Sequence, residues 1–186
     1  MTRTYVITGS ASGIGQATAE KLKSLGNTVI GVDIHNADVV ADLSTPQGRI
    51  DAAKKAIELS HDSIDAVIAC AGLAHPTATT VSVNYFGVTE FLNELLPTLT
   101  KSKTPRVVIT SSVASIMPNS TELVEAMCAN DEAKAVEIAQ ALVDAAAGGE
   151  QLIYGSTKRA ISRWIRQQCL KPHWAAAGIP INAVGP

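Results

Sequence analysis

The chain has 186 residues, 46% of them hydrophobic and 17% charged, which is typical of one globular domain and excludes a disordered chain. Its formal net charge is −2, so we expect neither nucleic acid nor an anionic membrane as a partner. No apolar run reaches the roughly 18 residues that a membrane span needs, and Met1 leads almost directly into an apolar run, so we expect no signal peptide and a cytoplasmic location.

The first predicted elements are a strand over 4–8, a glycine-rich turn, and a helix over 13–25. The turn reads Thr8-Gly9-Ser10-Ala11-Ser12-Gly13-Ile14-Gly15. In a dinucleotide-binding turn, one glycine permits the bend, one lets the backbone approach a pyrophosphate, and one lets helix pack against strand. The N–H groups of the helix N-terminus then face the phosphate charge. The spacing differs from the commoner Gly-x-Gly-x-x-Gly, and an ordinary tight turn is the alternative interpretation.

A second strand is predicted over 28–33, and it is apolar almost throughout, as expected for a strand buried on both faces. It ends in Asp33, 18 residues after Gly15, close to the spacing of about 20 that is typical of a ribose-binding acidic residue. An acidic side chain there can bind both hydroxyls of the adenosine ribose and repels a 2′-phosphate. The sequence therefore predicts NAD in preference to NADP, unless Asp33 merely starts a turn.

Strands and helices continue to alternate down the chain. We expect a short strand over 39–43, a helix from Ser44-Thr45-Pro46 to 59, a strand over 64–70, a mostly helical stretch over 76–101, a strand over 106–112, a helical stretch over 119–149, a long helix over 152–177 bent near Pro172 and capped by Gly178, and a strand over 179–184. This order implies an α/β fold, a Rossmann-type doubly wound parallel sheet with helices on both faces. We expect one NAD(P)-binding domain over 1–186.

Tyr154 and Lys158 are the strongest candidates for chemistry. Four residues apart on a helix, they share one face. A free tyrosine has a pKa near 10, and a neighbouring ammonium group favours the phenolate and lowers that pKa. Such a tyrosine can exchange a proton with an alcohol or a carbonyl oxygen. Ser112 ends a strand, at the edge where open parallel sheets bind ligands, and could hold the same oxygen. Alone, the pair could be a solvated lysine beside a packed tyrosine.

Together these residues resemble the short-chain dehydrogenase/reductase family over essentially the whole chain. The matching positions are Thr8, Gly9, Gly13, Gly15, Asp33, Asp42, Asn84, Ser112, Tyr154, Lys158 and the closing Ile181-Asn182-Ala183-Val184-Gly185-Pro186. The resemblance implies that Tyr154 is the general acid/base and that Lys158 holds the ribose and lowers the tyrosine pKa. It also implies that Ser112 binds the substrate oxygen and that Asn84 positions a water in a proton relay.

The resemblance also implies which residues contact the cofactor. They are Gly9, Ser12, Gly13, Ile14, Gly15, Asp33, Asp42, Leu43, Ala71, Gly72, Tyr154, Lys158 and Pro186. One departure from the family pattern lies among them. Most members have Asn-Ala-Gly after the fourth strand, whereas this chain has Cys70-Ala71-Gly72, so any contact of that amide is in doubt.

A second departure is the long spacing between Ser112 and Tyr154, which we attribute to a helical insertion over about 119–149. An insertion here is similar to the bacterial 3α-hydroxysteroid dehydrogenase/carbonyl reductase group of the family. That resemblance implies NAD(P)-dependent interconversion of a secondary alcohol and a ketone, with steroid or other carbonyl compounds as substrates. It also implies an altered oligomerisation face; the insertion could serve assembly or only cover surface, and a homodimer is possible.

The third departure is the C-terminus, since family members continue beyond the position of Pro186 with a substrate-covering segment and a last strand. We therefore expect a C-terminally incomplete sheet, either as a fragment or as a truncated product. The alternatives to an active oxidoreductase are a catalytically silent nucleotide-binding remnant and a reductase of the same family with another carbonyl substrate. The sequence does not identify the substrate.

Cysteine and histidine patterns argue against a metal site. The three cysteines, Cys70, Cys128 and Cys169, are far apart, form no CxxC pair, and suit a reducing compartment. The four histidines show no metal-ligand spacing and are interpreted as scattered polar residues: His35, His61, His75 and His173. We expect a small-molecule alcohol or ketone as the substrate.

Overall fold

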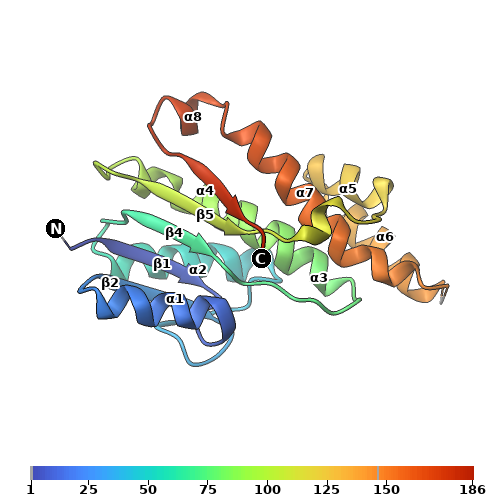
Figure 1. Ribbon diagram of the computed structural model, residues 1–186, viewed down its shortest axis with the longest axis horizontal. Coiled ribbons are helices and arrows are strands. Elements are labelled where there is room, and N and C mark those ends of the chain that lie inside the picture. Colours follow the sequence, from blue (N-terminus) through green and yellow to red (C-terminus); the bar gives the residue numbers. More distant parts are fainter. Residues whose placement is uncertain (1, 146) are drawn as a thin grey trace.

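A computed structural model describes residues 2–145 and 147–186 (Figure 1). The strands are β1 (Thr4–Thr8), β2 (Thr28–Asp33), β3 (Val39–Val40), β4 (Ala66–Ala69), β5 (Arg106–Thr110) and β6 (Ile181–Val184). Each neighbouring pair is parallel, in the order β3-β2-β1-β4-β5-β6. The predicted α/β doubly wound parallel sheet is confirmed. Its order reverses between β1 and β4, and such a switch point is where open α/β sheets bind ligands.

The helices cover both faces of this sheet. They are α1 (Gly13–Ser24), α2 (Pro46–Leu59), α3 (Thr79–Val81), α4 (Gly87–Leu99), α5 (Thr121–Cys128), α6 (Glu132–Asp144), α7 (Leu152–Gln168) and α8 (Pro172–Ala175), with a π-helical segment η1 (Ser82–Phe86) and the 3-10 turns η2 (Val113–Ile116) and η3 (Gly149–Gln151). Within the described ranges, no helix is both long and apolar enough to cross a membrane.

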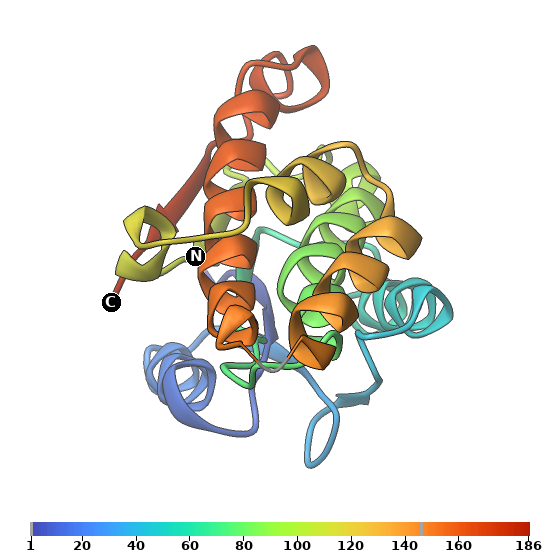
Figure 2. The same ribbon diagram turned by 90° about the vertical axis from the view of Figure 1, so that its right-hand side faces the viewer.

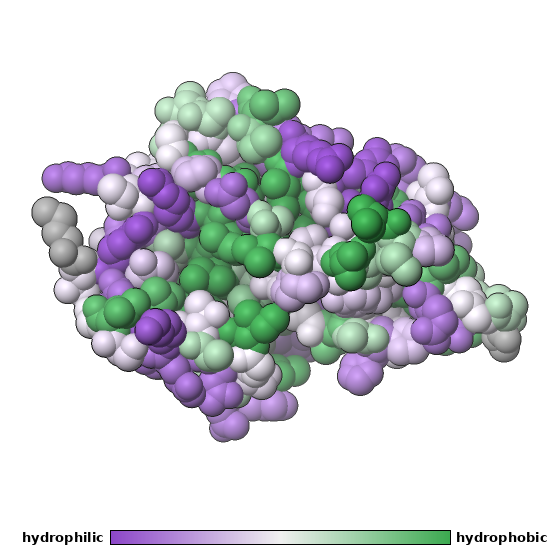
Figure 3. All heavy atoms as spheres, in the orientation of Figure 1, coloured by the Kyte–Doolittle hydropathy of each residue, from purple (hydrophilic) through white to green (hydrophobic). Residues whose placement is uncertain are grey.

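Consecutive residues of β1 point to opposite faces and join two different cores. Val6 belongs to a large cluster with side chains of α2, α4 and α7, whereas Ile7 packs with Ala19 of α1 in a small cluster. Figure 3 shows hydrophobic residues gathered over β4 and β5 on the α1 side of the sheet. There Ile68 and Val108 are only half-buried, so the α1 face is covered less completely than the opposite one.

The prediction of one long helix over 152–177 is wrong. Helix α7 ends at Gln168, and Lys171 adopts an extended conformation with φ −78° and ψ 143°. The residue before a proline is disfavoured in the helical region, so the chain turns there and Pro172 starts the separate helix α8. Gly178 follows with φ +68°, in agreement with its expected role as a cap.

The helical stretch expected over 119–149 is two helices, α5 and α6, followed by η3. Asn130 separates the two helices with φ +60°, a left-handed conformation that asparagine tolerates. Asp131 then caps α6 by accepting a hydrogen bond from the Lys134 N–H at 3.0 Å. Figure 2 shows the two helices on the outer side of α7 and α4.

Several expected strands are shorter in the structure. The strand expected over 39–43 ends at Val40, because the chain turns at Asp42, whose carboxylate accepts a hydrogen bond from the Ser44 N–H at 2.8 Å. The strands expected over 64–70, 106–112 and 179–184 also lose two or three end residues, leaving Ala66–Ala69, Arg106–Thr110 and Ile181–Val184. The shortening leaves loop backbone at the ends of β3, β4 and β5 that surround the candidate site.

Candidate active site

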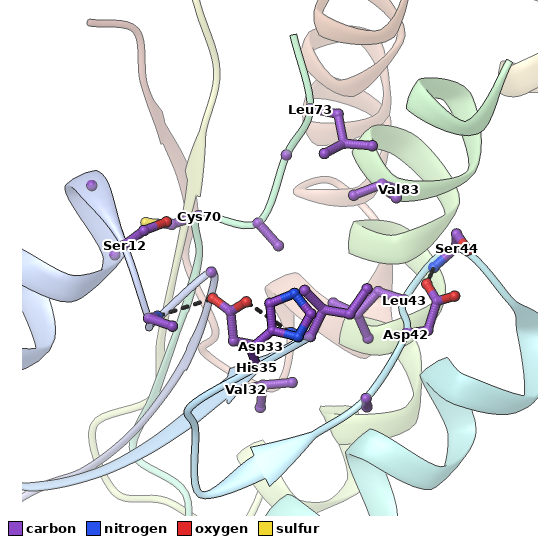
Figure 4. A pocket seen from close by; sticks show the side chains of 18 of the residues that line it. Ser12, Val32, Asp33, His35, Asp42, Leu43, Ser44, Cys70, Leu73 and Val83 are labelled. Carbon is purple, nitrogen blue, oxygen red and sulfur yellow. Dashed lines mark hydrogen bonds between the residues drawn. The ribbon is translucent and has the colours of Figure 1, made fainter. Parts of the chain in front are cut away.

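A cavity of about 680 Å³ opens at the carboxyl ends of β1, β2 and β4 (Figure 4). Its lining includes ten positions for which the resemblance implies a cofactor contact: Gly9, Ser12, Gly13, Ile14, Gly15, Asp33, Asp42, Leu43, Ala71 and Gly72. The doubly wound topology explains this assembly, since parallel strands deliver their carboxyl-terminal residues to one edge.

Two glycines of the turn after β1 are required by the backbone itself. Gly9 has φ +68°, and a Cβ on Gly9 would lie 2.8 Å from the Ala71 backbone nitrogen. A Cβ on Gly15 would lie 2.0 Å from the Gly9 carbonyl oxygen, so only glycine lets α1 pack this closely against the turn. The observed turn therefore has the close backbone approach that a pyrophosphate-binding loop needs.

The N-terminus of α1 has no side-chain cap among the described hydrogen bonds. Ser12 is the N-cap residue, and among the described hydrogen bonds its hydroxyl caps none of the first-turn N–H groups. Ile14 and Gly15 of that first turn line the cavity. Free N–H groups at a helix N-terminus suit a phosphate, so a dinucleotide pyrophosphate fits this end of the cavity.

Asp33 is anchored at the end of β2 with both carboxylate oxygens facing backbone donors. One oxygen accepts a hydrogen bond from the Ala11 N–H at 2.9 Å and the other from the Ile34 N–H at 2.7 Å. Each oxygen keeps a lone pair for a ribose hydroxyl. Asp42 also lines the cavity, and the described lining contains no lysine or arginine. A negatively charged 2′-phosphate would therefore meet carboxylates and no lysine or arginine side chain in the described lining.

The cavity also contains residues that the sequence did not single out as cofactor contacts. The sequence pattern predicts that His35 is a scattered polar residue, yet Figure 4 shows its ring beside the Asp33 side chain, inside the cavity lining. The other such residues include Ile34, Asn36, Ser44, Leu73, Thr79 and Val83. Proximity to Asp33 along the chain could have indicated Ile34 and His35, but no sequence signal indicated Thr79 or Val83.

Lys158 is buried beside Tyr154 on α7. Its ammonium donates a hydrogen bond to the Thr110 carbonyl oxygen at 2.8 Å and lies 5.7 Å from the centre of the Tyr154 ring. Burial disfavours the charged form and lowers the pKa of Lys158 to about 8, against a smaller opposing effect of Cys70. The expected pair is thus brought together on one helix face, with the lysine directed by the end of β5.

Asn84 lies within the π-helical segment η1, a type of helix distortion that is frequent at functional sites. Its side-chain oxygen accepts a hydrogen bond from the Leu73 N–H at 2.7 Å, and its amide donates to the Leu73 carbonyl at 2.9 Å and to the Thr157 hydroxyl at 3.2 Å. A Cβ on Gly72 would lie 3.3 Å from this side-chain oxygen and 3.8 Å from the Lys158 ammonium. Asn84, Gly72 and Lys158 are therefore neighbours.

Ser112 and Cys70 lie at the ends of neighbouring strands. The Ser112 hydroxyl accepts a hydrogen bond from the Ala114 N–H at 3.2 Å, at the start of η2. Cys70 replaces the family asparagine, and its thiol accepts a hydrogen bond from the Thr110 hydroxyl at 3.2 Å. Pro186 is exposed and lies outside the lining of the cavity, so its contact with the cofactor stays a prediction.

The described residues offer one half of the site for a dinucleotide and another for proton transfer. The glycine turn, the α1 N-terminus and Asp33 provide backbone space, N–H donors and a ribose acceptor, which together fit a nicotinamide dinucleotide. Tyr154 and Lys158 provide a proton donor and a nearby positive charge. In the part of the chain that the structure describes, no group of three or more His, Cys, Asp and Glu side chains could hold a metal ion.

Comparison with known proteins places these features in a family. The sequence model of the family described as short chain dehydrogenase matches residues 3–124. Similar proteins include the 3-alpha-hydroxysteroid dehydrogenase/carbonyl reductase of Comamonas testosteroni, 38% identical in an alignment that covers 97% of this chain and 70% of that protein. Another is the serine 3-dehydrogenase of Agrobacterium fabrum, 35% identical over 63% of this chain and 57% of that protein.

A solved structure supports the same relationship. The 3-alpha-hydroxysteroid dehydrogenase from Pseudomonas sp. B-0831, complexed with NADH, superposes with a TM-score of 0.90. Its sequence is 39% identical, and the match covers 98% of this chain and 78% of that one.

Proposed function

Because this chain belongs to the short-chain dehydrogenase family, we propose that it interconverts a secondary alcohol and a ketone with NAD as the preferred cofactor and Tyr154 as the proton carrier. The family membership makes the chain an oxidoreductase that uses NAD(P), related to 3α-hydroxysteroid dehydrogenases. The substrate class that we propose is a 3-hydroxy or 3-oxo steroid or another carbonyl compound, because the name of the Comamonas protein combines 3-alpha-hydroxysteroid dehydrogenase with carbonyl reductase.

The observation that carries this proposal is the placement of Lys158. Its buried ammonium is fixed by the Thr110 carbonyl and lies over the Tyr154 ring, next to Gly72 at the edge of the cavity. In this position the ammonium donors of Lys158 can hold the ribose of a bound cofactor next to the tyrosine hydroxyl that exchanges the proton. The cofactor, when bound, supplies or accepts the hydride.

The residues around the pair have separate tasks in this proposal. Tyr154 donates a proton to the carbonyl oxygen during reduction and takes it back from the alcohol during oxidation. Ser112 holds the same oxygen by a hydrogen bond. Lys158 and the helix N-terminus after the glycine turn orient the cofactor, and Asn84 positions a water through which Tyr154 gains a proton from solvent during reduction and loses one to it during oxidation.

Replacing Tyr154 by phenylalanine tests the proton-transfer role directly. Tyr154→Phe keeps the ring and removes the hydroxyl, so we expect turnover of a ketone panel to fall by about 10²-fold or more while the affinity for NADH stays within a few-fold. NADH binding is measured by cofactor fluorescence and turnover by NADH oxidation. Retained turnover contradicts the role of Tyr154.

The wild-type chain separates the remaining alternatives in the same assays. Saturable NADH binding without turnover of any ketone or alcohol would support a catalytically silent nucleotide-binding protein. Turnover restricted to small non-steroid carbonyl compounds would support a reductase with another substrate. A preference for steroid ketones supports the substrate class proposed above.

A further inference from the structure

Arg49 is a fully buried charged residue that the proposed chemistry does not use. It lies on α2, and its side chain is 0% exposed. Its Nε donates a hydrogen bond to the Leu43 carbonyl oxygen at 2.8 Å, and its Nη2 donates to the Ser44 carbonyl at 3.0 Å and to the Ser82 carbonyl at 3.3 Å. An arginine side chain has five N–H donors, and those of Arg49 are directed to backbone carbonyl and carboxylate acceptors.

The three carbonyl groups that Arg49 contacts belong to the wall of the candidate cofactor cavity or adjoin it. Leu43 and Ser44 line the cavity, and Ser82 immediately precedes another lining residue, Val83. Figure 4 shows Leu43 and Ser44 across the cavity from Asp33. Since Asp33 is the residue placed to bind the adenosine ribose, this wall faces the adenosine half of the cofactor.

Two carboxylates hold the other side of the guanidinium. Glu90 of α4 accepts a hydrogen bond from Nη1 at 2.8 Å, and Glu132 of α6 accepts from Nη1 at 2.7 Å and from Nη2 at 2.6 Å. Burial opposes the charge, but the hydrogen bonds to Glu132 and Glu90 outweigh it and raise the pKa of Arg49. A buried ion that loses a partner is strongly destabilising, so this geometry is tightly constrained.

Close backbone packing constrains the same wall from two sides. A Cβ on Gly48 would lie 2.0 Å from the Asp42 carbonyl oxygen, and a Cβ on Gly87 would lie 3.1 Å from the Leu43 carbonyl oxygen. The backbone of the wall therefore lies directly against α2 and α4. A shift of Arg49 would have to move the wall, because little space separates them.

We propose that Arg49 and Glu132 are positioning residues for the adenosine half of the cofactor, and that helix α6 thereby sets the shape of the cofactor cavity. The inference rests on the proposed NAD-binding function. It gives the helical pair α5–α6 a third role beside assembly and surface cover, because Glu132 is the first residue of α6 and bonds to Arg49 with both carboxylate oxygens.

The test uses two ligands that differ in whether they contain the adenosine half of the cofactor. ADP-ribose contains the whole adenosine half together with the ribose of the other half, and reduced nicotinamide mononucleotide contains the nicotinamide half without the adenosine. In Glu132→Gln, which keeps the side-chain shape, we expect ADP-ribose to bind about tenfold more weakly because charge-assisted hydrogen bonds are lost. Affinity for the mononucleotide should stay unchanged. In turnover, KM for NADH should rise by a similar factor, with kcat at saturating NADH unchanged.

A matched control removes a different ion pair, one that also involves the helical pair α5–α6 but whose residues do not line the cavity. Glu125 of α5 pairs with Arg163 of α7 at 2.5 Å, with both side chains partly exposed. Glu125→Gln should leave both affinities unchanged. Glu132→Asp, which restores the charge with a shorter side chain, should recover part of the ADP-ribose affinity and provides a second variant if Glu132→Gln does not fold.

The outcomes separate this inference from the proposed function. If the wild-type chain binds neither NADH nor ADP-ribose, the proposed function fails. If the wild-type chain binds both and folded Glu132→Gln keeps its ADP-ribose affinity, the positioning role is wrong. Equal weakening of ADP-ribose and the mononucleotide would indicate general loosening of the fold and would also overturn it.

Discussion

At the residue scale, the proposed preference for NAD over NADP rests on the negative charge of Asp33, which would repel a 2′-phosphate. Asp33→Asn keeps the size of the side chain and removes its charge. Two opposite or like charges about 4 Å apart interact by about 4 kcal/mol near a protein surface, so removing the repulsion should shift the NADPH-to-NADH affinity ratio at least about tenfold toward NADPH. Fluorescence titration with both cofactors measures the ratio.

The control for Asp33 is a carboxylate outside the cavity. Asp144 ends α6 at an exposed position and accepts a hydrogen bond from Gln140 at 2.8 Å. Asp144→Asn should leave the ratio unchanged. If Asp33→Asn and Asp144→Asn have the same ratio, the charge of Asp33 does not select the cofactor.

Lys158 should give the cofactor-free protein a specific dependence of stability on pH. Burial lowers its pKa from 10.5 to about 8 in the folded state. Between these values the unfolded chain binds more protons than the folded one, so the free energy of unfolding rises with pH in this window. Below about pH 8 the lysine is charged in both states, and the full cost of burying that charge is present.

The measurement compares wild type with Lys158→Met, which keeps an apolar chain of similar length and does not titrate. Urea unfolding at a series of pH values gives the difference in unfolding free energy between them. We expect wild type to gain stability relative to the variant as pH rises above about 8. A constant difference from pH 7 to 10 would show that the lysine is not desolvated in solution.

At the element scale, the start of α6 depends on the Asp131 cap. Asp131→Ala removes the acceptor for the Lys134 N–H and should lower the free energy of unfolding by about 1 kcal/mol. Asp131→Asn keeps a side-chain oxygen and should retain most of the stability. Urea unfolding of the three proteins tests this, and equal loss in both variants would mean that charge, and not capping, stabilises the helix.

The sequence predicted the central elements better than the peripheral ones. Strands Thr4–Thr8 and Thr28–Asp33 were predicted with their observed bounds, because strands buried on both faces show continuous apolar runs. The prediction of one helix up to 177 is wrong near Pro172. The apolar pattern continues there, but the residue before a proline disfavours the helical conformation, so the helix cannot continue through it. Turn residues such as Asn130 decide helix ends, and their conformation is not visible in periodicity.

In the candidate site, too, residues placed by their own strand could be predicted from the sequence, whereas a residue placed by partners distant in the sequence could not. Gly9, Asp33 and Ala71 could be predicted as neighbours because each closely follows or ends a strand, and parallel strands share one edge. Arg49 was missed, since an arginine on an amphipathic helix usually indicates a solvent-facing position. Its burial depends on Glu90 and Glu132, which are distant in sequence and have no pattern that links them to Arg49.

At the scale of the whole molecule, the cavity exists only when several elements are assembled. Its lining comes from the ends of β1, β2 and β4 together with α1 and η1, so a ligand there binds the folded state alone. NADH at 100 times its Kd should therefore raise the free energy of unfolding by about 2.7 kcal/mol. For a chain of this size the melting temperature should rise by roughly 5–10 °C.

Thermal melting with and without NADH checks this expectation, with sodium chloride at matched ionic strength as the control. Salt alone should shift the melting temperature only slightly. Most of the cavity lining is backbone and apolar groups, and only its few carboxylates respond to ionic strength. An NADH effect no larger than that of salt, at a concentration that saturates the fluorescence titration, would mean that NADH also binds the unfolded chain.

The corner between α7 and α8 gives the molecule a built-in optical probe. The chain has two tryptophans, Trp164 and Trp174, and their rings meet edge to face with centres 6.2 Å apart. Both are buried, at 6% and 0% exposure, so their emission should lie at short wavelength in the native state. A red shift on mild heating would report that this corner opens, while the fluorescence of bound NADH independently reports the cavity. Tryptophan emission and NADH emission can thus be recorded in one sample to follow the α7–α8 corner and the cavity independently.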